Sequence, residues 1–218
     1  MKATRLYLLR HGQVAGFEEK RYNGQTNVPL TETGRAQMDR LCQVLSAIPL
    51  EAVYSSDLER CVYGAARLGQ EIGLPVTTDA ALREMDCGQW QGRPWQSLAH
   101  DFPEEWRARL QDIVHYRMPS GESFHDAAER IRPVLRAILE RHAGHQIALF
   151  GHGGINRIVL LDALGAPLDA AFSIVQDYAC LNIIDYLPDG SCRVKLMNGH
   201  TLPMSAGICP LDDSRVNR

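Results

Sequence analysis

The feature that most constrains the fold is a short apolar run at residues 6–9, which ends abruptly in Arg10, His11 and Gly12. The run is long enough for a buried strand and too short for an independent helix. Ligands bind at the carboxyl ends of strands in open α/β sheets. Arginine offers a planar fork of donors for phosphate or carboxylate, and a neutral histidine offers a nucleophile or base. An isolated Arg-His-Gly could equally be the polar end of a strand. The choice between a functional site and a polar strand end therefore depends on the rest of the chain.

Strands and helices alternate along the chain. Apolar runs of strand length occur at residues 4–9, 52–55, 75–78, 147–150, 180–187 and 192–197. Apolar residues at helical spacing lie at 31–48, 58–73, 123–142 and 155–164. This alternation predicts an α/β fold of three layers, αβα, with a mostly parallel central sheet. We expect a single domain over residues 1–218, in which an insertion at about 85–122 covers the active site.

Composition excludes several classes of protein. The 218 residues are 45% hydrophobic and 22% charged, which suits one globular domain with a sizeable core. The net charge of -3 and the lack of a basic arm argue against nucleic acid as a partner. No apolar run reaches membrane-spanning length, and the start of the chain lacks a signal-peptide core. The six cysteines are scattered without a C-x-x-C pair, so we expect reduced thiols in the cytoplasm.

Three predicted strands bring cationic and imidazole side chains to one sheet edge. The first delivers Arg10 and His11, the second is followed by Arg60, and the fourth by His152 in a glycine-rich turn at a helix N-terminus. Such a group of donors is costly without an anion, and phosphate is the best match. Because the chain has no P-loop and no acidic cluster, we expect a mechanism without metal or cofactor. His11 would attack through Nε2, with Nδ1 held by a backbone carbonyl near Gly12.

The proton for the leaving group must come from the segment over the site. The sequence LREMD at 82–86 offers Glu84 and Asp86. We prefer Glu84, because it directly follows a stretch of chain that is predicted to be apolar and to lead towards the site.

Other polar and aromatic residues receive structural interpretations. Asp57 is interpreted as an N-cap. His142 and His145 are interpreted as a solvated helix end rather than as part of a metal site. The tail at 203–218 is expected to be loosely held. Three tryptophans are interpreted as the core of the insertion, one of which could stack on a substrate ring: Trp90, Trp95 and Trp106.

The chain resembles the histidine phosphatase superfamily, in its phosphoglycerate-mutase-like branch. The matching stretches are LLRHG (8–12), RYNGQTNVPLTETG (21–34), SSDLERC (55–61), LREMDCGQWQG (82–92), GESF (121–124) and GHGG (151–154), in the family's order. The resemblance implies that His11 becomes phosphorylated and that Glu84 is the general acid. It implies a phosphate pocket of Arg10, Arg60 and His152, with His152 also counted as catalytic. Further substrate contacts are implied for Asn23, Gly24 and Gly153.

The resemblance implies a metal-independent phosphomonoester hydrolase acting on a small phosphorylated metabolite. Within the family the chain most resembles α-ribazole phosphatase of the cobalamin pathway and broad-specificity phosphatases. A phosphoglycerate mutase is an alternative, disfavoured by the short tail. A catalytically weak, phosphate-ester-binding protein is another. Val14 and Phe17 suggest this weak activity, because the family commonly carries Ser or Thr at the place of Val14 and Asn at the place of Phe17. Whether the chain forms a homodimer stays open.

Overall fold

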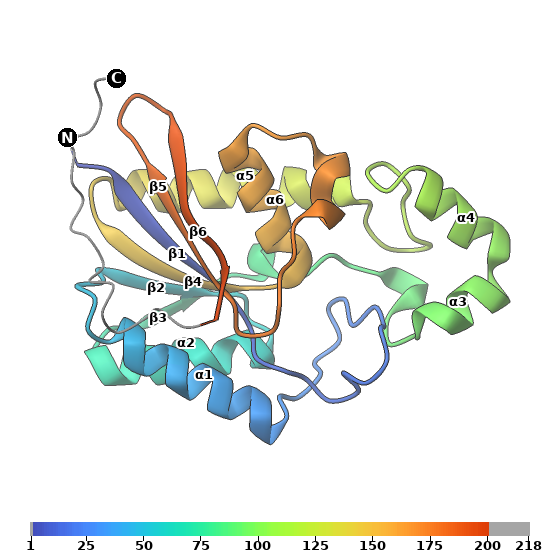
Figure 1. Cartoon of the computed structure of the whole chain (residues 1–218), viewed down its shortest axis with the longest axis horizontal. Coiled ribbons are helices and arrows are strands. Elements are labelled where there is room, and N and C mark those ends of the chain that lie inside the picture. Colours follow the sequence, from blue (N-terminus) through green and yellow to red (C-terminus); the bar gives the residue numbers. More distant parts are fainter. Residues whose placement is uncertain (1, 201–218) are drawn as a thin grey trace.

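A six-stranded sheet, in the order β3-β2-β4-β1-β5-β6, lies at the centre of residues 2–200, the part of the chain that the computed structural model describes (Figure 1). The strands are β1 (Thr4–Arg10), β2 (Ala52–Ser55), β3 (Val76–Thr78), β4 (Gln146–Gly151), β5 (Leu181–Tyr186) and β6 (Cys192–Gly199). The β1–β4, β2–β4 and β2–β3 pairs are parallel, whereas the β1–β5 and β5–β6 pairs are antiparallel. The predicted mostly parallel sheet is confirmed.

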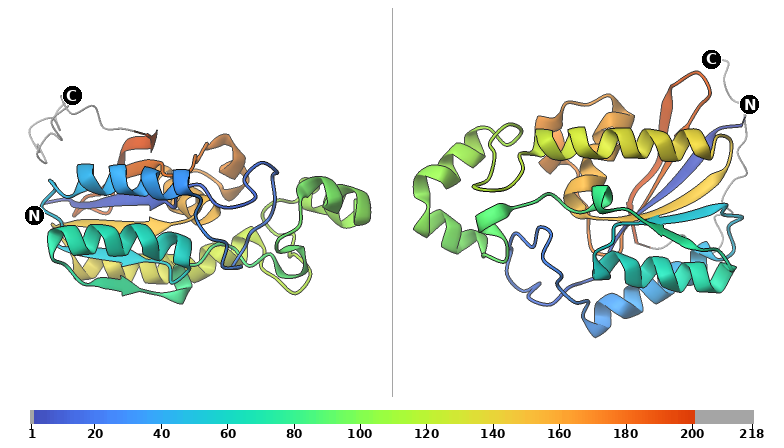
Figure 2. Two further views of the ribbon diagram at one scale, coloured as in Figure 1. Left: turned by 90° about the horizontal axis from the view of Figure 1, so that it is seen from below. Right: turned by 180° about the vertical axis from the view of Figure 1, so that it is seen from behind.

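Helices cover both faces of this sheet (Figure 2). The helices α1 (Glu32–Leu45) and α2 (Glu59–Ile72) lie on one face, and α5 (Phe124–Arg141) and α6 (Gly153–Leu164) lie on the other. Successive residues of a strand point to opposite faces. Accordingly, Leu6 and Leu8 pack with α5 and α6, while Tyr7 and Leu9 pack with α1 and α2. These two cores confirm the three-layer architecture.

Local capping signals define several of the helix ends. The Thr31 side chain accepts a hydrogen bond from the Gly34 amide and begins α1. Ser123 and Asp126 form a capping box that begins α5. Gly73, in the left-handed conformation with φ of 72°, ends α2. The helix α6 begins at Gly153, earlier than its apolar periodicity predicts.

Residues 80–122 leave the sheet and form short helices beyond the carboxyl ends of the strands (Figure 1). They comprise the 3₁₀ turns η1 (Ala80–Leu82) and η2 (Gly88–Trp90) and the helices α3 (Trp95–Asp101) and α4 (Pro103–Gln111). Trp90 is buried here, with the Trp106 ring 6.1 Å and the Tyr116 ring 5.8 Å from its own. The interpretation of Trp90 and Trp106 as local core is therefore correct. Another 3₁₀ segment, η3 (Leu168–Ser173), was not predicted.

Two structural interpretations of the sequence are wrong. Asp57 does not cap α2, whose N-cap position is Leu58; it forms a two-point ion pair with Arg83, at 2.6 and 2.5 Å. His142 is buried rather than solvated. Its ring nitrogens lie 2.9 Å from the Tyr54 hydroxyl and 3.0 Å from a Glu51 carboxylate oxygen.

His145 also contacts Glu51. Both histidines therefore have a carboxylate partner, which sequence spacing conceals because Glu51 comes more than eighty positions earlier. The predicted loose tail lies outside the described residues. None of the described helices combines the length and apolar character needed to span a membrane.

Candidate active site

A pocket of about 170 Å³ opens where β1 and β4 end. Its walls come from the loop after β1, the start of α2, the Glu84 segment, the start of α6 and the segment between α6 and β5. The helices α3 and α4 and the start of α5 add Trp95, Arg109 and Phe124. Seven of the predicted site residues line it: Arg10, His11, Asn23, Gly24, Arg60, Glu84 and Gly153. The eighth, His152, is fully buried behind the wall, with its ring centroid 5.4 Å from that of His11. The structure thus brings together residues from five separate stretches of sequence.

His11 is buried and held in one tautomer. Its Nδ1 lies 2.8 Å from the Gly12 carbonyl oxygen. Because a carbonyl can only accept, Nδ1 carries the proton, and the neutral ring has its lone pair on Nε2. Burial lowers the pKa of His11 well below its usual value, and the charges of Arg60 and Arg10 lower it further. The geometry therefore provides a neutral imidazole at neutral pH, as the sequence led us to expect.

Two glycines allow the His11 loop to pack against the start of α1. A Cβ atom at Gly12 would overlap the Gly34 carbonyl, and one at Gly34 would overlap the Gln13 carbonyl. The backbone of the His11 loop and the backbone at the start of α1 therefore lie in direct contact, with no room for a side chain between them. This contact explains the glycine in both the RHG and the TETG sequences.

Backbone carbonyls hold Arg10 and Arg60, two of the arginines that line the pocket. Arg10 donates from Nη1 to the Gln176 carbonyl. Arg60 donates from Nη1 to the Thr26 oxygen and from Nη2 to the Gly24 oxygen, each at 2.7 Å. Arg10 lies over the Tyr178 ring, 4.2 Å from its centroid. Among the described residues neither arginine forms an ion pair, and the Nε atom of each lacks a hydrogen-bond partner. Cations placed in this way suit an anionic ligand.

His152 adds a second neutral imidazole beneath the pocket. Burial lowers its pKa well below the usual value, with further contributions from the charges of Arg60 and His11. Its Nε2 lies 3.4 Å from the buried Cys61 sulfur. His152 occupies the N-cap position of α6, so the amides of that helix N-terminus come to the pocket wall.

The Glu84 carboxylate lies at the N-terminus of α6. One oxygen accepts from the Gly154 amide and the other from the Met85 amide, each at 3.0 Å. The alternative acid, Asp86, accepts from the Gly88 amide at 2.8 Å and does not line the pocket. This placement favours Glu84 over Asp86.

Asn23 and Gly24 form a turn, in which the Thr26 amide donates to the Asn23 carbonyl at 3.0 Å. Gly24 has a φ of 50°, and its carbonyl holds Arg60. Both residues also line the pocket. The turn and the expected place beside the substrate are therefore compatible.

Several residues that line the pocket are not among those predicted from the sequence. Arg157 lies one turn after Gly153 on α6 and donates to its carbonyl at 3.0 Å, so i,i+4 spacing could have revealed it. Arg109 of α4 is buried and donates to the Ile113 carbonyl at 2.8 Å. Tyr178 supports Arg10 from a segment without periodicity. Arg109 and Tyr178 had no signal in the sequence.

Val14 and Phe17 lie apart from the pocket walls. Val14 is fully buried in the α1–α2 core and forms a β-bridge with Leu30. Phe17 is 44% exposed. In the described part of the chain, no cluster of three or more His, Cys, Asp or Glu side chains is arranged to hold a metal ion.

Comparison with known proteins is consistent with this geometry. The model of the histidine phosphatase superfamily (branch 1) matches residues 6–199. A bifunctional protein of Mycobacterium tuberculosis is 34% identical over 196 residues, which is 89% of this chain and 54% of that protein. The chain thus spans about half the length of this relative. A probable phosphoglycerate mutase of Yersinia pestis is 32% identical over 182 residues, covering 83% of this chain and 84% of the relative.

Solved structures share the fold as well. A putative α-ribazole-5′-phosphate phosphatase from Escherichia coli superimposes with a TM-score of 0.84 at 27% identity, covering 92% of this chain and 98% of that one. A mycobacterial glucosyl-3-phosphoglycerate phosphatase superimposes with a TM-score of 0.80 at 28% identity, covering 91% of this chain and all of the other.

Proposed function

Because the chain belongs to the histidine phosphatase superfamily, we propose that it is a phosphomonoester hydrolase that works through a phosphohistidine on His11. The observation that carries this proposal is the tautomer of His11, whose Nδ1 is engaged with the Gly12 carbonyl in a pocket walled by Arg10 and Arg60. A nucleophile needs its lone pair free and the anion it attacks held in place. Membership of a phosphatase family adds support.

The proposed mechanism has two steps. In the first, His11 Nε2 bonds to phosphorus as the ester P–O bond breaks, and Glu84 donates a proton to the departing alkoxide oxygen. In the second, Glu84 takes a proton from water, whose oxygen bonds to phosphorus as the P–Nε2 bond of the phosphohistidine breaks. This step releases inorganic phosphate and restores the neutral His11 ring. Arg10, Arg60 and His152 stabilise the charge on the phosphoryl oxygens, so we propose that no metal ion is needed.

We propose a small phosphorylated metabolite as the substrate, with α-ribazole 5′-phosphate as the first candidate. Phosphatases so named are among the similar structures, and their pathway would place the enzyme in cobalamin biosynthesis in the cytoplasm. The aromatic wall of Tyr22, Trp95 and Phe124 suits a flat leaving group. The same proposal treats the chain as a single domain whose segment 85–122 covers the pocket and selects the leaving group.

A phosphoglycerate mutase is the second candidate. The relative from Yersinia carries that name, and Arg109 provides a specific observation in its favour. This buried guanidinium lines the pocket without an ion pair among the described residues, so an acidic leaving group would compensate its charge. For a catalytically weak, phosphate-ester-binding protein the described residues offer no specific observation, since Val14 and Phe17 do not line the pocket.

A panel of phosphomonoesters tests the proposal. Release of phosphate from α-ribazole 5′-phosphate, 3-phosphoglycerate and p-nitrophenyl phosphate should be measured with and without excess EDTA. We expect turnover that EDTA does not reduce, and none in His11→Ala. Activity that is abolished by EDTA and restored by magnesium would contradict the metal-free step. Conversion of 3-phosphoglycerate to 2-phosphoglycerate, without phosphate release, would favour the mutase.

Trapping the intermediate tests the nucleophile directly. A brief incubation with ³²P-labelled substrate should leave label on the protein that is stable to base and labile to acid. His11→Ala should lose both the label and the turnover, whereas replacing the exposed His100 by Ala should change neither. Turnover retained in His11→Ala would mean another nucleophile, or direct attack by water.

A further inference from the structure

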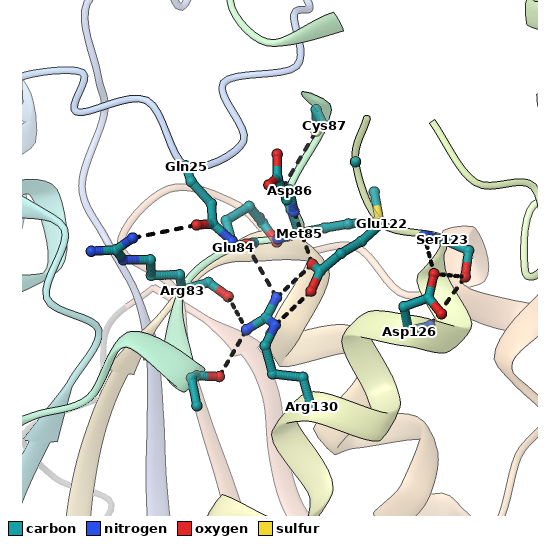
Figure 3. Close-up of polar contacts among 12 residues, drawn as sticks. Gln25, Arg83, Glu84, Met85, Asp86, Cys87, Glu122, Ser123, Asp126 and Arg130 are labelled. Carbon is teal, nitrogen blue, oxygen red and sulfur yellow. Dashed lines mark hydrogen bonds and ion pairs between the residues drawn. The ribbon is translucent and has the colours of Figure 1, made fainter. Parts of the chain in front are cut away.

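One arginine of α5 holds the backbone of the loop that carries Glu84 (Figure 3). Arg130 donates from Nε and Nη2 to the two Glu122 oxygens at 2.7 and 2.8 Å. Its Nη1 donates to the carbonyls of Ala81 and Arg83 at 2.8 and 3.0 Å, and Nη2 also donates to the Glu84 carbonyl at 3.3 Å. These bonds use all five N–H donors of the guanidinium, so no other cationic side chain could make the same set.

Glu122 extends this hold to the other side of Glu84. Its Oε2 accepts from the Asp86 amide at 2.9 Å, and its own amide donates to the Asp86 carbonyl at 2.8 Å. Glu122 directly precedes Ser123, the N-cap of α5, so it sits on a rigid helix end. The ion pair therefore fixes the backbone before and after Glu84 to one helix.

The pair is shielded from solvent but does not touch the pocket. The Arg130 and Glu122 side chains are 21% and 18% exposed, so their attraction is less screened than that of a surface pair. Neither residue lines the pocket, and neither bonds the Glu84 carboxylate. Any contribution they make to the chemistry is therefore indirect, through the loop whose backbone they hold, and Glu84 is the acid on that loop.

The position of a general acid matters steeply. The acid must lie within hydrogen-bond reach of the leaving oxygen, and a misplacement of about 1 Å can cost roughly 10²-fold in rate. On this basis we propose that the Arg130–Glu122 ion pair is a positioning device that keeps the Glu84 carboxyl at the α6 N-terminus, aimed at the leaving group. The proposal rests on the proposed function, in which Glu84 gives its proton to the alkoxide oxygen as the P–O bond breaks.

Leaving-group dependence tests this role. An alkyl phosphate needs the proton, whereas p-nitrophenolate leaves largely unaided. We expect Arg130→Lys and Glu122→Gln to lower kcat/KM on propyl phosphate by about 10- to 100-fold and on p-nitrophenyl phosphate by no more than about 3-fold. Arg132→Lys is the matched control: it lies on the same helix, forms a two-point ion pair with Asp162 and should leave both rates unchanged.

A double-mutant cycle separates positioning from general loosening. In a Glu84→Gln background, Arg130→Lys should cause no further loss on propyl phosphate, because its effect acts through the missing acid. Equal losses on both esters, or a full additional loss in that background, would overturn the inference while leaving the phosphatase intact. If the wild type hydrolyses neither ester, the proposed function itself fails and this inference falls with it. Glu122→Gln preserves side-chain shape, so it keeps the test decisive even if Arg130→Lys does not fold.

Discussion

The Glu84 carboxylate accepts a 3.0 Å hydrogen bond from the Gly154 amide, and a Cβ atom at position 154 would lie 2.5 Å from Glu84 Oε1. A side chain at residue 154 would therefore push the Glu84 carboxylate away from the position that it has at the start of α6. A carboxylate is also favoured at a helix N-terminus, where unpaired amides and the helix dipole face it. The approach of Glu84 to the pocket is thus determined by a residue far away in the sequence.

The first prediction concerns this contact. Gly154→Ala should displace Glu84, because the added methyl group occupies the space of its Oε1. We expect kcat/KM on propyl phosphate to fall by about 10- to 100-fold, with a smaller fall on p-nitrophenyl phosphate. Steady-state kinetics on the two esters checks this. If Gly154→Ala retains wild-type rates on propyl phosphate, the contact has no part in catalysis.

A second prediction concerns Arg60. Its guanidinium bonds two loop carbonyls at once and still presents an unpartnered Nε, a pattern that the single ammonium of lysine cannot reproduce. Arg60→Lys should therefore lower kcat/KM and weaken inhibition by vanadate, each by about 10-fold or more. Arg67→Lys, on an exposed part of the same helix, is the control. Unchanged vanadate inhibition in Arg60→Lys would place this side chain outside the anion site.

Much of the fold could be predicted from the sequence because its signals are local. A glycine follows the apolar runs of both β1 and β4, and Thr31 and Ser123 are strong N-caps. The parallel topology then requires Arg10, His11 and His152 to share one edge, so most of the candidate site follows from strand order.

The remaining parts depend on contacts that sequence spacing does not encode. From its position in the sequence Asp57 is predicted to be a helix cap, but in the fold it pairs with Arg83. His142 is predicted to be solvated, but in the fold it packs against Glu51 and Tyr54. Arg130 likewise resembles any surface arginine on an amphipathic helix. Its role depends on loop carbonyls that only the folded chain brings to it.

A third prediction follows from the two buried histidines. The pKa values of His11 and His152 lie well below that of an unfolded histidine, which is about 6.5. Below pH 6.5 the unfolded chain therefore binds more protons than the folded one. The free energy of unfolding should fall as the pH drops, by up to about 1.4 kcal/mol per pH unit for each histidine.

Urea unfolding between pH 5 and 8 measures this dependence. His152→Gln should flatten the slope between pH 5 and 6.5, because one of the two groups is removed. Replacing His100 by Gln should not, since that side chain is exposed. A slope in His152→Gln equal to that of the wild type would show that folding does not lower the pKa of His152.

The last prediction concerns Val14 and Phe17, where the family commonly carries polar residues. Val14 packs with no exposed surface in the α1–α2 core, so Val14→Thr would bury a hydroxyl among apolar side chains. We expect it to lower the free energy of unfolding by about 1–3 kcal/mol. Phe17 is exposed and lines no part of the pocket, so Phe17→Asn should change kcat/KM by less than about 2-fold and leave stability within about 0.5 kcal/mol. Kinetics on p-nitrophenyl phosphate and urea unfolding of both variants supply the test. If either variant were instead to raise kcat/KM by about 10-fold or more, that side chain would have to reach the phosphoryl group, and the lost polar contact would limit the natural rate.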